Sequence, residues 1–246
     1  MSRIRIIGLA LAAVFAMSAT ASASAAEYIY KVAGAKLEAG VKTEITSKAK
    51  TTFVLKGEVL GIKSETKCKT EKLNAAEKPV IVGGAPGTSE KELVEFGECS
   101  ATLGGAACKS VKVNNTTTSN EIVTVVLPAA KAGKLATLFT PPTKVFTTIE
   151  LKECGAFGTQ KAEVTGTTAA LDSPEKVEQA TGTLIFKAGA EEITEVGCLK
   201  ETTTCTGAEK KAPFRQKVGL KFGGNAATLE GESEVSLVSG QSWGVY

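Results

Sequence analysis

The chain of 246 residues contains no histidine, and this absence excludes several common kinds of site. Histidine is the most frequent general base, the most frequent zinc ligand and the side chain whose ordinary pKa lies between about pH 5 and 8. Nucleophiles of the Ser-His-Asp or Cys-His type therefore cannot be assembled. We expect no catalytic residue, no metal site and no cofactor, and the composition favours a protein that is not an enzyme.

Aspartate, arginine and aromatic side chains are also scarce. Asp172 is the only aspartate, Arg215 is the only arginine after residue 5, and aromatic residues make up 5% of the chain. A nucleic-acid partner would require clustered basic residues with interleaved aromatic rings, whereas the formal net charge is only +3. No nucleic-acid partner is expected.

Long apolar runs are confined to the first 26 residues. There Arg3 and Arg5 precede an apolar stretch over 6–15 and a stretch of small residues over 18–26. This is the organisation of a secretory signal peptide, with cleavage expected just before Ala26 or Glu27. About 12 apolar residues are too few to cross a bilayer, which takes roughly 20. We predict that 1–26 is removed on export and that 27–246 forms a single secreted or cell-surface domain without a transmembrane segment.

An even number of cysteines in an exported chain predicts disulfides. The six cysteines would form three bridges, and the sequence alone leaves their connectivity open. We favour Cys99–Cys108 and Cys198–Cys205, because each would tie a short local turn, and this leaves Cys68 to pair with Cys154. A redox or metal site is not indicated, since the chain has no C-x-x-C motif and no histidine.

Alternation of apolar and polar residues dominates the chain after residue 27. It is clearest over 144–152, 215–222 and 227–237, and this period of two is typical of strands with one buried face. The 122–127 segment is apolar on both faces and predicts a central strand. We predict an all-β fold, an antiparallel β-sandwich or barrel-like sandwich with disulfide-tied hairpins. Further strands are expected at 28–32, 41–45, 51–55, 59–68, 80–82, 93–98, 110–113, 135–139, 162–165 and 183–187.

Signals for helices are few. Ser89-Glu-Lys-Glu92 has the pattern of a capping box, and the segment from Ser173 to Gln179 has a composition that can open one or two helical turns. Either segment can instead lead into a strand. No helix longer than two turns is expected.

Several segments resemble a known group of proteins. They are GIKSETKC (61–68), EFGEC (95–99), CKSVKV (108–113), EIVTVVLPAAKAGKL (121–135) and SEVSLVSGQSWGVY (233–246). Together they resemble uncharacterised exported, cysteine-containing β-rich proteins of high-GC Gram-positive bacteria. The resemblance covers most of the exported part and rests on cysteine, glycine and strand spacings. It implies an exported β-rich fold and carries no functional residue over to this chain.

Two sets of residues are candidates for a binding or reacting site. Glu230, Glu232 and Glu234 share one strand face, where neighbours lie about 7 Å apart, so they could serve as paired carboxylates of a glycosidase or as oxygen ligands of calcium. A charged, solvated strand face is the preferred interpretation. Trp243 and Tyr246 would form a sugar-stacking pair if both were exposed, and the preferred alternative is that Trp243 closes one end of the core.

The function favoured by these observations is that of a secreted or cell-envelope-associated, non-enzymatic binding or structural protein. Its partner would be an extracellular polymer, a glycan or another protein. One alternative is an extracellular carbohydrate-active enzyme that uses paired Glu. A second is a secreted inhibitor or effector that presents the Cys99–Cys108 hairpin as a constrained loop.

Overall fold

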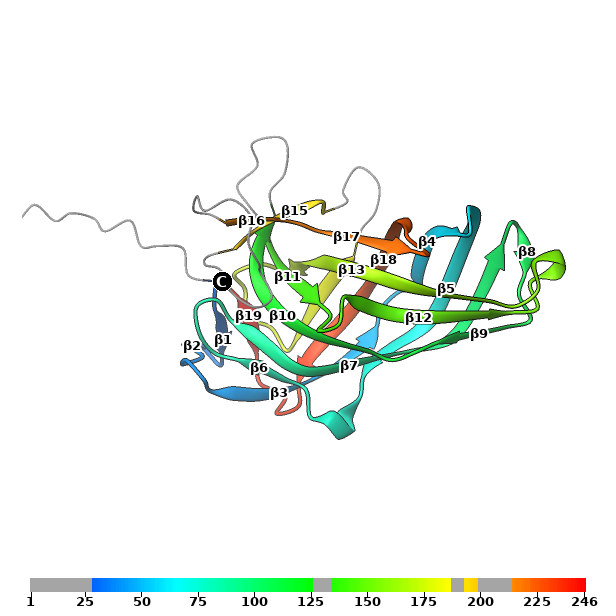
Figure 1. Cartoon of the computed structure of the whole chain (residues 1–246). Helices are drawn as coiled ribbons and strands as arrows, with labels where there is room; N and C mark the ends of the chain where they lie inside the picture. The colour runs from blue at the N-terminus through cyan, green and yellow to red at the C-terminus, as the bar shows by residue number, and fades with distance from the viewer. Residues whose placement is uncertain (1–27, 126–133, 187–192, 199–213) are drawn as a thin grey trace, which may run out of the picture.

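A computed structural model describes residues 28–125, 134–186, 193–198 and 214–246, and this part of the chain is built almost entirely of antiparallel strands. Its only helical segments are two single 3-10 turns, η1 (Ala75–Glu77) and η2 (Gly155–Phe157). The predicted all-β class and sandwich architecture are therefore confirmed (Figure 1). The predicted signal peptide lies outside the described residues.

Strands of very different length follow one another along the chain. The long ones are β5 (Ile62–Leu73), β7 (Thr88–Leu103), β10 (Thr116–Val125), β13 (Gln160–Ser173) and β18 (Asn225–Leu237). The shorter ones are β1 (Tyr30–Val32), β2 (Ala35–Lys36), β3 (Lys42–Ala49), β4 (Phe53–Val59), β6 (Val80–Val82), β8 (Ala106–Ala107), β9 (Ser110–Val113), β11 (Leu135–Thr140), β12 (Val145–Lys152), β14 (Thr181–Phe186), β15 (Glu195–Cys198), β16 (Phe214–Lys217), β17 (Gly219–Phe222) and β19 (Trp243–Val245).

The pairing of these strands closes on itself and divides the fold into two halves. In one half β18 pairs β3, β3 pairs β6, and the ring continues through β7, β10, β11, β13 and β14 back to β18. In the other half β7 pairs β5, and the order continues through β4, β18, β17, β13 and β12 to β9, which lies beside β7. We call the first the cavity half and the second the disulfide half. The long strands β7, β13 and β18 run through both.

The alternation seen in the sequence determines which side of each strand faces inward. In β18 the set Ala227, Ser233, Val235 and Leu237 is buried while the glutamates between them reach the surface, as predicted. Strand β12 departs from strict alternation, because its register with β13 shifts between Val145 and Thr147. Strict alternation over 144–152 would place Phe146 on the face opposite Ile149 and Leu151, but this irregularity turns it into the core with them.

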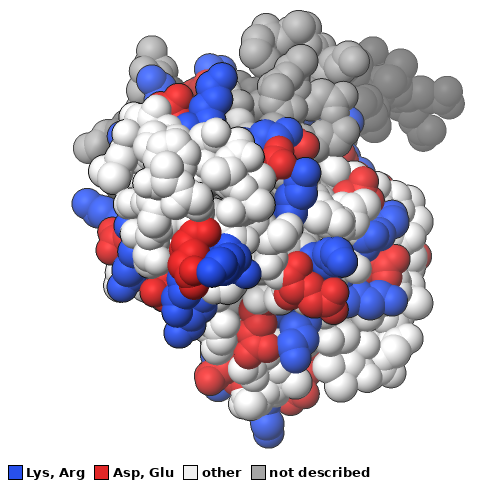
Figure 2. Space-filling view, turned by 90° about the vertical axis from the view of Figure 1, so that its right-hand side faces the viewer, with Lys and Arg blue, Asp and Glu red and all other residues white. Residues whose placement is uncertain are grey.

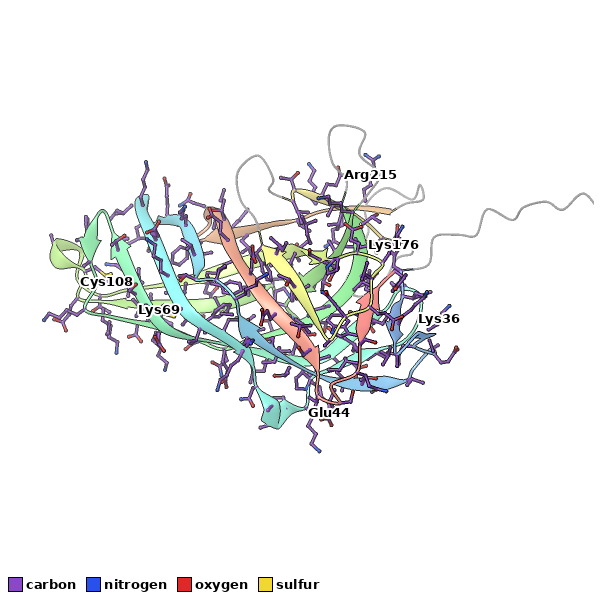
Figure 3. The ribbon with its side chains drawn as sticks, turned by 180° about the vertical axis from the view of Figure 1, so that it is seen from behind. Lys36, Glu44, Lys69, Cys108, Lys176 and Arg215 are labelled. Atoms are coloured by element: carbon purple, nitrogen blue, oxygen red, sulfur yellow. A yellow bond between two sulfur atoms is a disulfide. The ribbon has the colours of Figure 1, made fainter. Side chains whose placement is uncertain are left out.

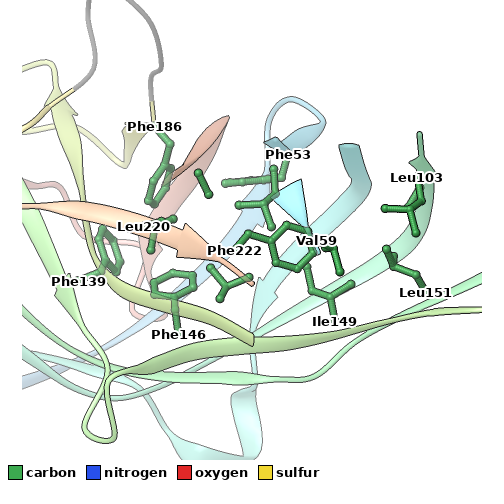
Figure 4. Packing of buried hydrophobic residues seen from close by; sticks show 14 of the residues in the cluster. Phe53, Val59, Leu103, Phe139, Phe146, Ile149, Leu151, Phe186, Leu220 and Phe222 are labelled. Carbon is green, nitrogen blue, oxygen red and sulfur yellow. The ribbon is translucent and has the colours of Figure 1, made fainter. Parts of the chain in front are cut away.

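Phenylalanine side chains fill the space where the two halves meet (Figure 4). The Phe53 ring lies 5.5 Å from Phe96 and 5.6 Å from Phe186, both in edge-to-face orientation, and Phe186 lies 5.2 Å from Phe139. Such pairs stabilise by about 1 kcal/mol beyond the area they bury. The core is therefore continuous from one half of the fold to the other.

The segments with weak helix signals form no helix. Ser89 and Glu92 lie within β7, so the capping-box prediction is wrong and the alternative of a strand is confirmed. The pattern misleads because a serine followed by a glutamate three residues later also fits a strand whose register shifts, and β7 pairs β10 irregularly between Ser89 and Glu92. The segment from Ser173 to Gln179 contains bends and a single β-bridge from Gln179 to Trp243.

Neither bridge described by the structure joins the two ends of a turn: one joins the neighbouring strands β5 and β7, and the other joins segments that flank the paired strands β9 and β12. Cys68 of β5 lies opposite Cys99 of β7 and bonds to it. Cys108 bonds to Cys154, at the end of the molecule opposite Lys36 and Lys176 (Figure 3). The predicted pairs Cys99–Cys108 and Cys68–Cys154 are therefore wrong.

The register of the strands explains the correction. In the hairpin of β7 and β8, Thr102 lies opposite Ala107, and the Cys108 amide donates to the Ala101 carbonyl. Cys108 is thus beyond reach of Cys99, which lies further back along β7. The predicted Cys198–Cys205 bridge involves Cys205, which lies outside the described residues.

Among the residues that the structure describes, no helix has the length and apolar character needed to cross a bilayer.

Candidate functional site

Three carboxyl groups point into the interior of the cavity half. Glu71 lies near the end of β5, Glu92 lies in the first part of β7, and Asp172 lies near the end of β13. Each is about 6% exposed and falls in phase with inward-facing residues of its strand. A carboxylate costs free energy when it leaves water, so its hydrogen-bond partners decide whether such a position is tolerated.

Neutral donors surround these acids. The Ser47 hydroxyl donates to Glu71 Oε1 over 2.7 Å, and the Ser233 hydroxyl donates to Glu71 Oε2 over 2.6 Å. The Asn120 amide donates to Glu92 Oε2. Both Glu71 oxygens are therefore satisfied by side chains of β3 and β18, which are directly paired strands.

Asp172 has a weaker set of partners. The Thr137 hydroxyl of β11 lies 3.1 Å from one Asp172 oxygen and 3.3 Å from the other. Thr137 and Asp172 belong to β11 and β13, which are adjacent strands of the cavity half. This single shared hydroxyl leaves hydrogen-bonding capacity on the carboxyl group unused by the described side chains.

Burial shifts the titration of all these groups. It raises the pKa of Glu92 to about 7, and the nearby charge of Glu71 adds to the rise. It raises the pKa of Asp172 to about 7, where the Glu175 charge adds and the Thr137 hydrogen bond opposes. Burial also raises the pKa of Glu71, against the effect of its two serine partners. The chain therefore has groups that titrate near neutral pH although it lacks histidine.

Tyr30 and Trp243 complete the polar lining. Their ring centroids lie 6.1 Å apart at a tilt of 53°. Burial, together with the charges of Asp172 and Glu92, holds the pKa of the Tyr30 hydroxyl well above its usual value. Tyr30 is therefore a neutral phenol whose pKa is raised further by the charges of Asp172 and Glu92.

These residues enclose a cavity of about 60 Å³. Most of its wall is apolar and comes from side chains such as Ile45, Leu73, Val94 and Leu184. A water molecule needs about 10–15 Å³ of such space, so the cavity has room for about four to six non-hydrogen atoms. It is too small for a sugar ring. Within the described part of the chain, no group of three or more acidic or cysteine side chains is placed to hold a metal ion.

A second concave feature lies on the outer face of the disulfide half. It is a hollow of about 650 Å³ that extends across β18, β4, β5 and β7. Thr228 lies opposite Lys56, Lys56 opposite Glu65, and Glu65 opposite Thr102, so one row of side chains crosses all of these strands. We call this feature the outer hollow. Its other lining residues are Gly57, Glu58, Lys63, Ser64, Gly105, Asn225 and Ala226.

Gly57 helps to form the outer hollow from beneath. A Cβ atom at this position would lie 2.9 Å from the Phe222 Cβ atom and 3.2 Å from the Ala227 Cβ atom. Because Gly57 has no side chain, β4 can pack closely against β17 at this point. The outer face of β4 is therefore lowered toward the core. Figure 2 looks onto this end of the molecule and shows lysine and glutamate side chains interspersed, without a large area of one sign.

The three glutamates singled out in the sequence lie on the solvated face of β18, as the preferred interpretation held. Glu230 pairs with Lys56 at 3.3 Å, Glu232 with Lys50 at 3.4 Å and Glu234 with Lys48 at 3.0 Å. Each glutamate therefore has a lysine partner on a neighbouring strand. The structure does not bring them together around a concave site.

The stacking pair is not formed at the surface. Trp243 is 6% exposed and lies in β19 against Gly182, whereas Tyr246 is partly exposed and has the Lys31 ammonium 4.0 Å from its ring centroid. Trp243 thus closes one end of the core, which was the preferred interpretation. It also faces the interior cavity.

The interior acids were missed by the sequence analysis, although a signal for them exists. Glu92 precedes Val94 and Phe96 at a spacing of two, and Asp172 follows Ala170 at the same spacing. An acid in phase with the inward side of a strand indicates a buried carboxyl group. The buried position of Glu92 was overlooked because Ser89 to Glu92, at the start of β7, match the pattern of a helix cap.

Comparisons with known proteins complete the description of the candidate sites. A scan against protein-family models finds no match, and searches of curated proteins and of solved structures find none either.

Proposed function

We propose that this is a secreted or cell-envelope-associated protein without enzymatic activity, which binds an extracellular glycan polymer in the outer hollow. The observation that carries the proposal is the size and position of that hollow. Its volume of about 650 Å³ falls in the range of roughly 300–1,000 Å³ that ligand sites occupy. The interior cavity is an order of magnitude smaller and cannot take such a ligand.

The chemistry of the outer hollow suits a polyhydroxylated ligand. Its lining combines the hydroxyl groups of Thr102 and Thr228 with the Asn225 amide and both signs of charge. The lysines donate hydrogen bonds, the glutamates accept them, and the hydroxyl and amide groups do both, as sugar hydroxyls require. The surface is also rigid, because most of it comes from paired strands and only part of it from turns.

Export of the protein is part of the same proposal. Two described disulfides and the leader-like sequence support an oxidising, extracellular compartment. The paired-Glu enzyme has less support, because Glu230, Glu232 and Glu234 are engaged by lysines on an exposed face. The alternative of an inhibitor or effector required a loop closed by a Cys99–Cys108 bond. That loop is not formed, since Cys99 bonds to Cys68.

Binding can be tested by co-sedimentation of the oxidised chain of residues 27–246 with purified cell-wall glycan and with other insoluble polysaccharides. Lys63 lines the outer hollow, whereas Lys69 lies exposed on the same strand outside it. Lys63→Glu should weaken the affinity at least tenfold, because a hydrogen bond to a charged group contributes roughly 1.5–3 kcal/mol. Lys69→Glu serves as the matched control and should bind like the wild type.

Two results would contradict the proposal. Equal retention of both variants would place binding elsewhere, and absence of retention on every glycan would remove the polymer as the ligand. Analysis of soluble products in the same incubations separates binding from hydrolysis, since released sugars would show enzymatic activity.

A further inference from the structure

The interior cavity contains three buried carboxyl groups that no described cation balances. None of the ion pairs formed among the described residues involves Glu71, Glu92 or Asp172. The donors that do reach them are neutral hydroxyl and amide groups. Buried carboxylates are ordinarily paired with a positive partner, so this cavity differs from the usual arrangement.

Two further polar atoms at the cavity wall are buried and have no hydrogen-bond partner among the described residues. They are Asn120 Oδ1, an acceptor, and Trp243 Nε1, which carries an N–H donor. Asn120 is 1% exposed, and its amide nitrogen is already engaged by Glu92. Buried polar groups are satisfied in the great majority of cases, so a complementary group is expected at each of these atoms.

One small molecule could supply the partners that these carboxyl groups, Asn120 Oδ1 and Trp243 Nε1 lack among the described residues. A positive donor would serve the carboxylates and Asn120 Oδ1, and an oxygen acceptor would serve the Trp243 N–H group. We propose that the cavity is a binding site for a small primary amine that also carries a hydroxyl group, the chemical class of the simple amino alcohols. This site is separate from the outer hollow and does not depend on the function proposed for it.

The dimensions and walls of the cavity agree with this class of ligand. A two-carbon amino alcohol has four non-hydrogen atoms, which about 60 Å³ can hold. The apolar side chains of the wall accommodate the carbon atoms, and the aromatic faces of Tyr30 and Trp243 favour a nearby ammonium group. Amines with more than about six non-hydrogen atoms would exceed the space.

Ethanolamine is the probe that tests the proposal. Trp243 is the only tryptophan of the chain and lies at the cavity wall, so its fluorescence reports binding directly. The folded, oxidised protein is equilibrated overnight with ethanolamine at pH 8, which is above the pKa values of about 7 of Glu92 and Asp172. A saturable change in Trp243 emission is expected, and calorimetry under the same conditions should give the same Kd.

Two probes of nearly identical shape separate the contributions of the two ends. Ethylene glycol replaces the ammonium group by a hydroxyl and should bind at least tenfold more weakly. Propylamine replaces the hydroxyl by a methyl group and should bind about fivefold more weakly, the effect of one lost hydrogen bond. Glu92→Gln and Asp172→Asn should each weaken ethanolamine binding at least tenfold, while Glu230→Gln on the outer face should leave it unchanged.

Several outcomes would overturn the assignment. Absence of any response to ethanolamine would leave water as the occupant of the cavity. Binding of ethylene glycol as tight as that of ethanolamine would exclude a charged ligand, and equal binding of propylamine would exclude the amino-alcohol class. Unchanged binding to both acid variants would place the ligand outside the cavity. Circular dichroism and the emission maximum of Trp243 establish that each variant is folded.

Discussion

The folded protein should lose stability as the pH rises from about 4 to about 7, opposite to the usual behaviour of carboxyl groups in ion pairs. Glu92 and Asp172 have folded-state pKa values of about 7, above their ordinary values of 4.5 and 3.8. In this interval the folded state binds more protons than the unfolded state, so the free energy of unfolding falls with pH. The stabilisation is complete below the ordinary values and is lost as the pH passes about 7.

The expected effect is large because the two groups add. One pKa unit corresponds to about 1.4 kcal/mol, so each acid contributes roughly 3–4 kcal/mol across the interval. Glu71 changes in the same direction, since its pKa is also raised by burial. The groups that face these acids are Tyr30, which stays neutral, and Glu175, whose charge raises the pKa of Asp172 further.

Urea unfolding at a series of pH values between 4 and 8 measures this dependence, with the disulfides kept intact. The double variant Glu92→Gln, Asp172→Asn removes both titrations and should flatten the profile, so that it exceeds the wild type in stability at pH 8. Glu230→Gln, which removes a surface carboxylate, should leave the profile as it is. A wild-type profile that is flat or rises between pH 4.5 and 7 would contradict the burial of these acids.

Removal of either described disulfide should cost about 4 kcal/mol of stability. The bonds Cys68–Cys99 and Cys108–Cys154 close loops of 31 and 46 residues, and loop entropy of the unfolded chain gives a similar contribution for both. The double variants Cys68→Ser, Cys99→Ser and Cys108→Ser, Cys154→Ser are compared with the wild type by urea unfolding. Both bridges lie in the disulfide half, which shares β7, β13 and β18 with the cavity half, so their removal should lower the stability of the whole domain.

Peptide mapping of the unreduced protein checks the pairing itself. Fragments that contain Cys68 and Cys99 should remain joined until a reductant is added, as should fragments that contain Cys108 and Cys154. A fragment that joins Cys99 to Cys108 would contradict the strand register described above. Double variants as stable as the wild type would contradict the entropic contribution.

Much of the fold follows from periodicity, because a strand with one buried face shows its inward residues at every second position. This explains why β18 and β17 are predicted with the right side inward. Phe146 is the informative exception. A shift of register between neighbouring strands cannot be seen in one segment alone, since it depends on the partner strand.

The disulfide pairing and the hydrogen-bond partners of the interior acids were beyond prediction for a related reason. Cys108 and Cys154 are brought together by the pairing of β9 with β12, which are separated by more than 30 residues of chain. Short sequence separation therefore favoured the wrong partner for Cys108. Glu92 shows the same dependence, because only the pairing of β7 with β10 places Asn120 beside it.

The strands β7, β13 and β18 each extend through both halves, and this has a consequence for how the molecule comes apart. Ser233, which holds Glu71, and Thr228, which lines the outer hollow, belong to the same continuous strand. Neither half can open without withdrawing these strands from the other, so the two halves should behave as one cooperative unit. Amide protons in both should then exchange with solvent at a common slow rate, set by opening of the whole domain.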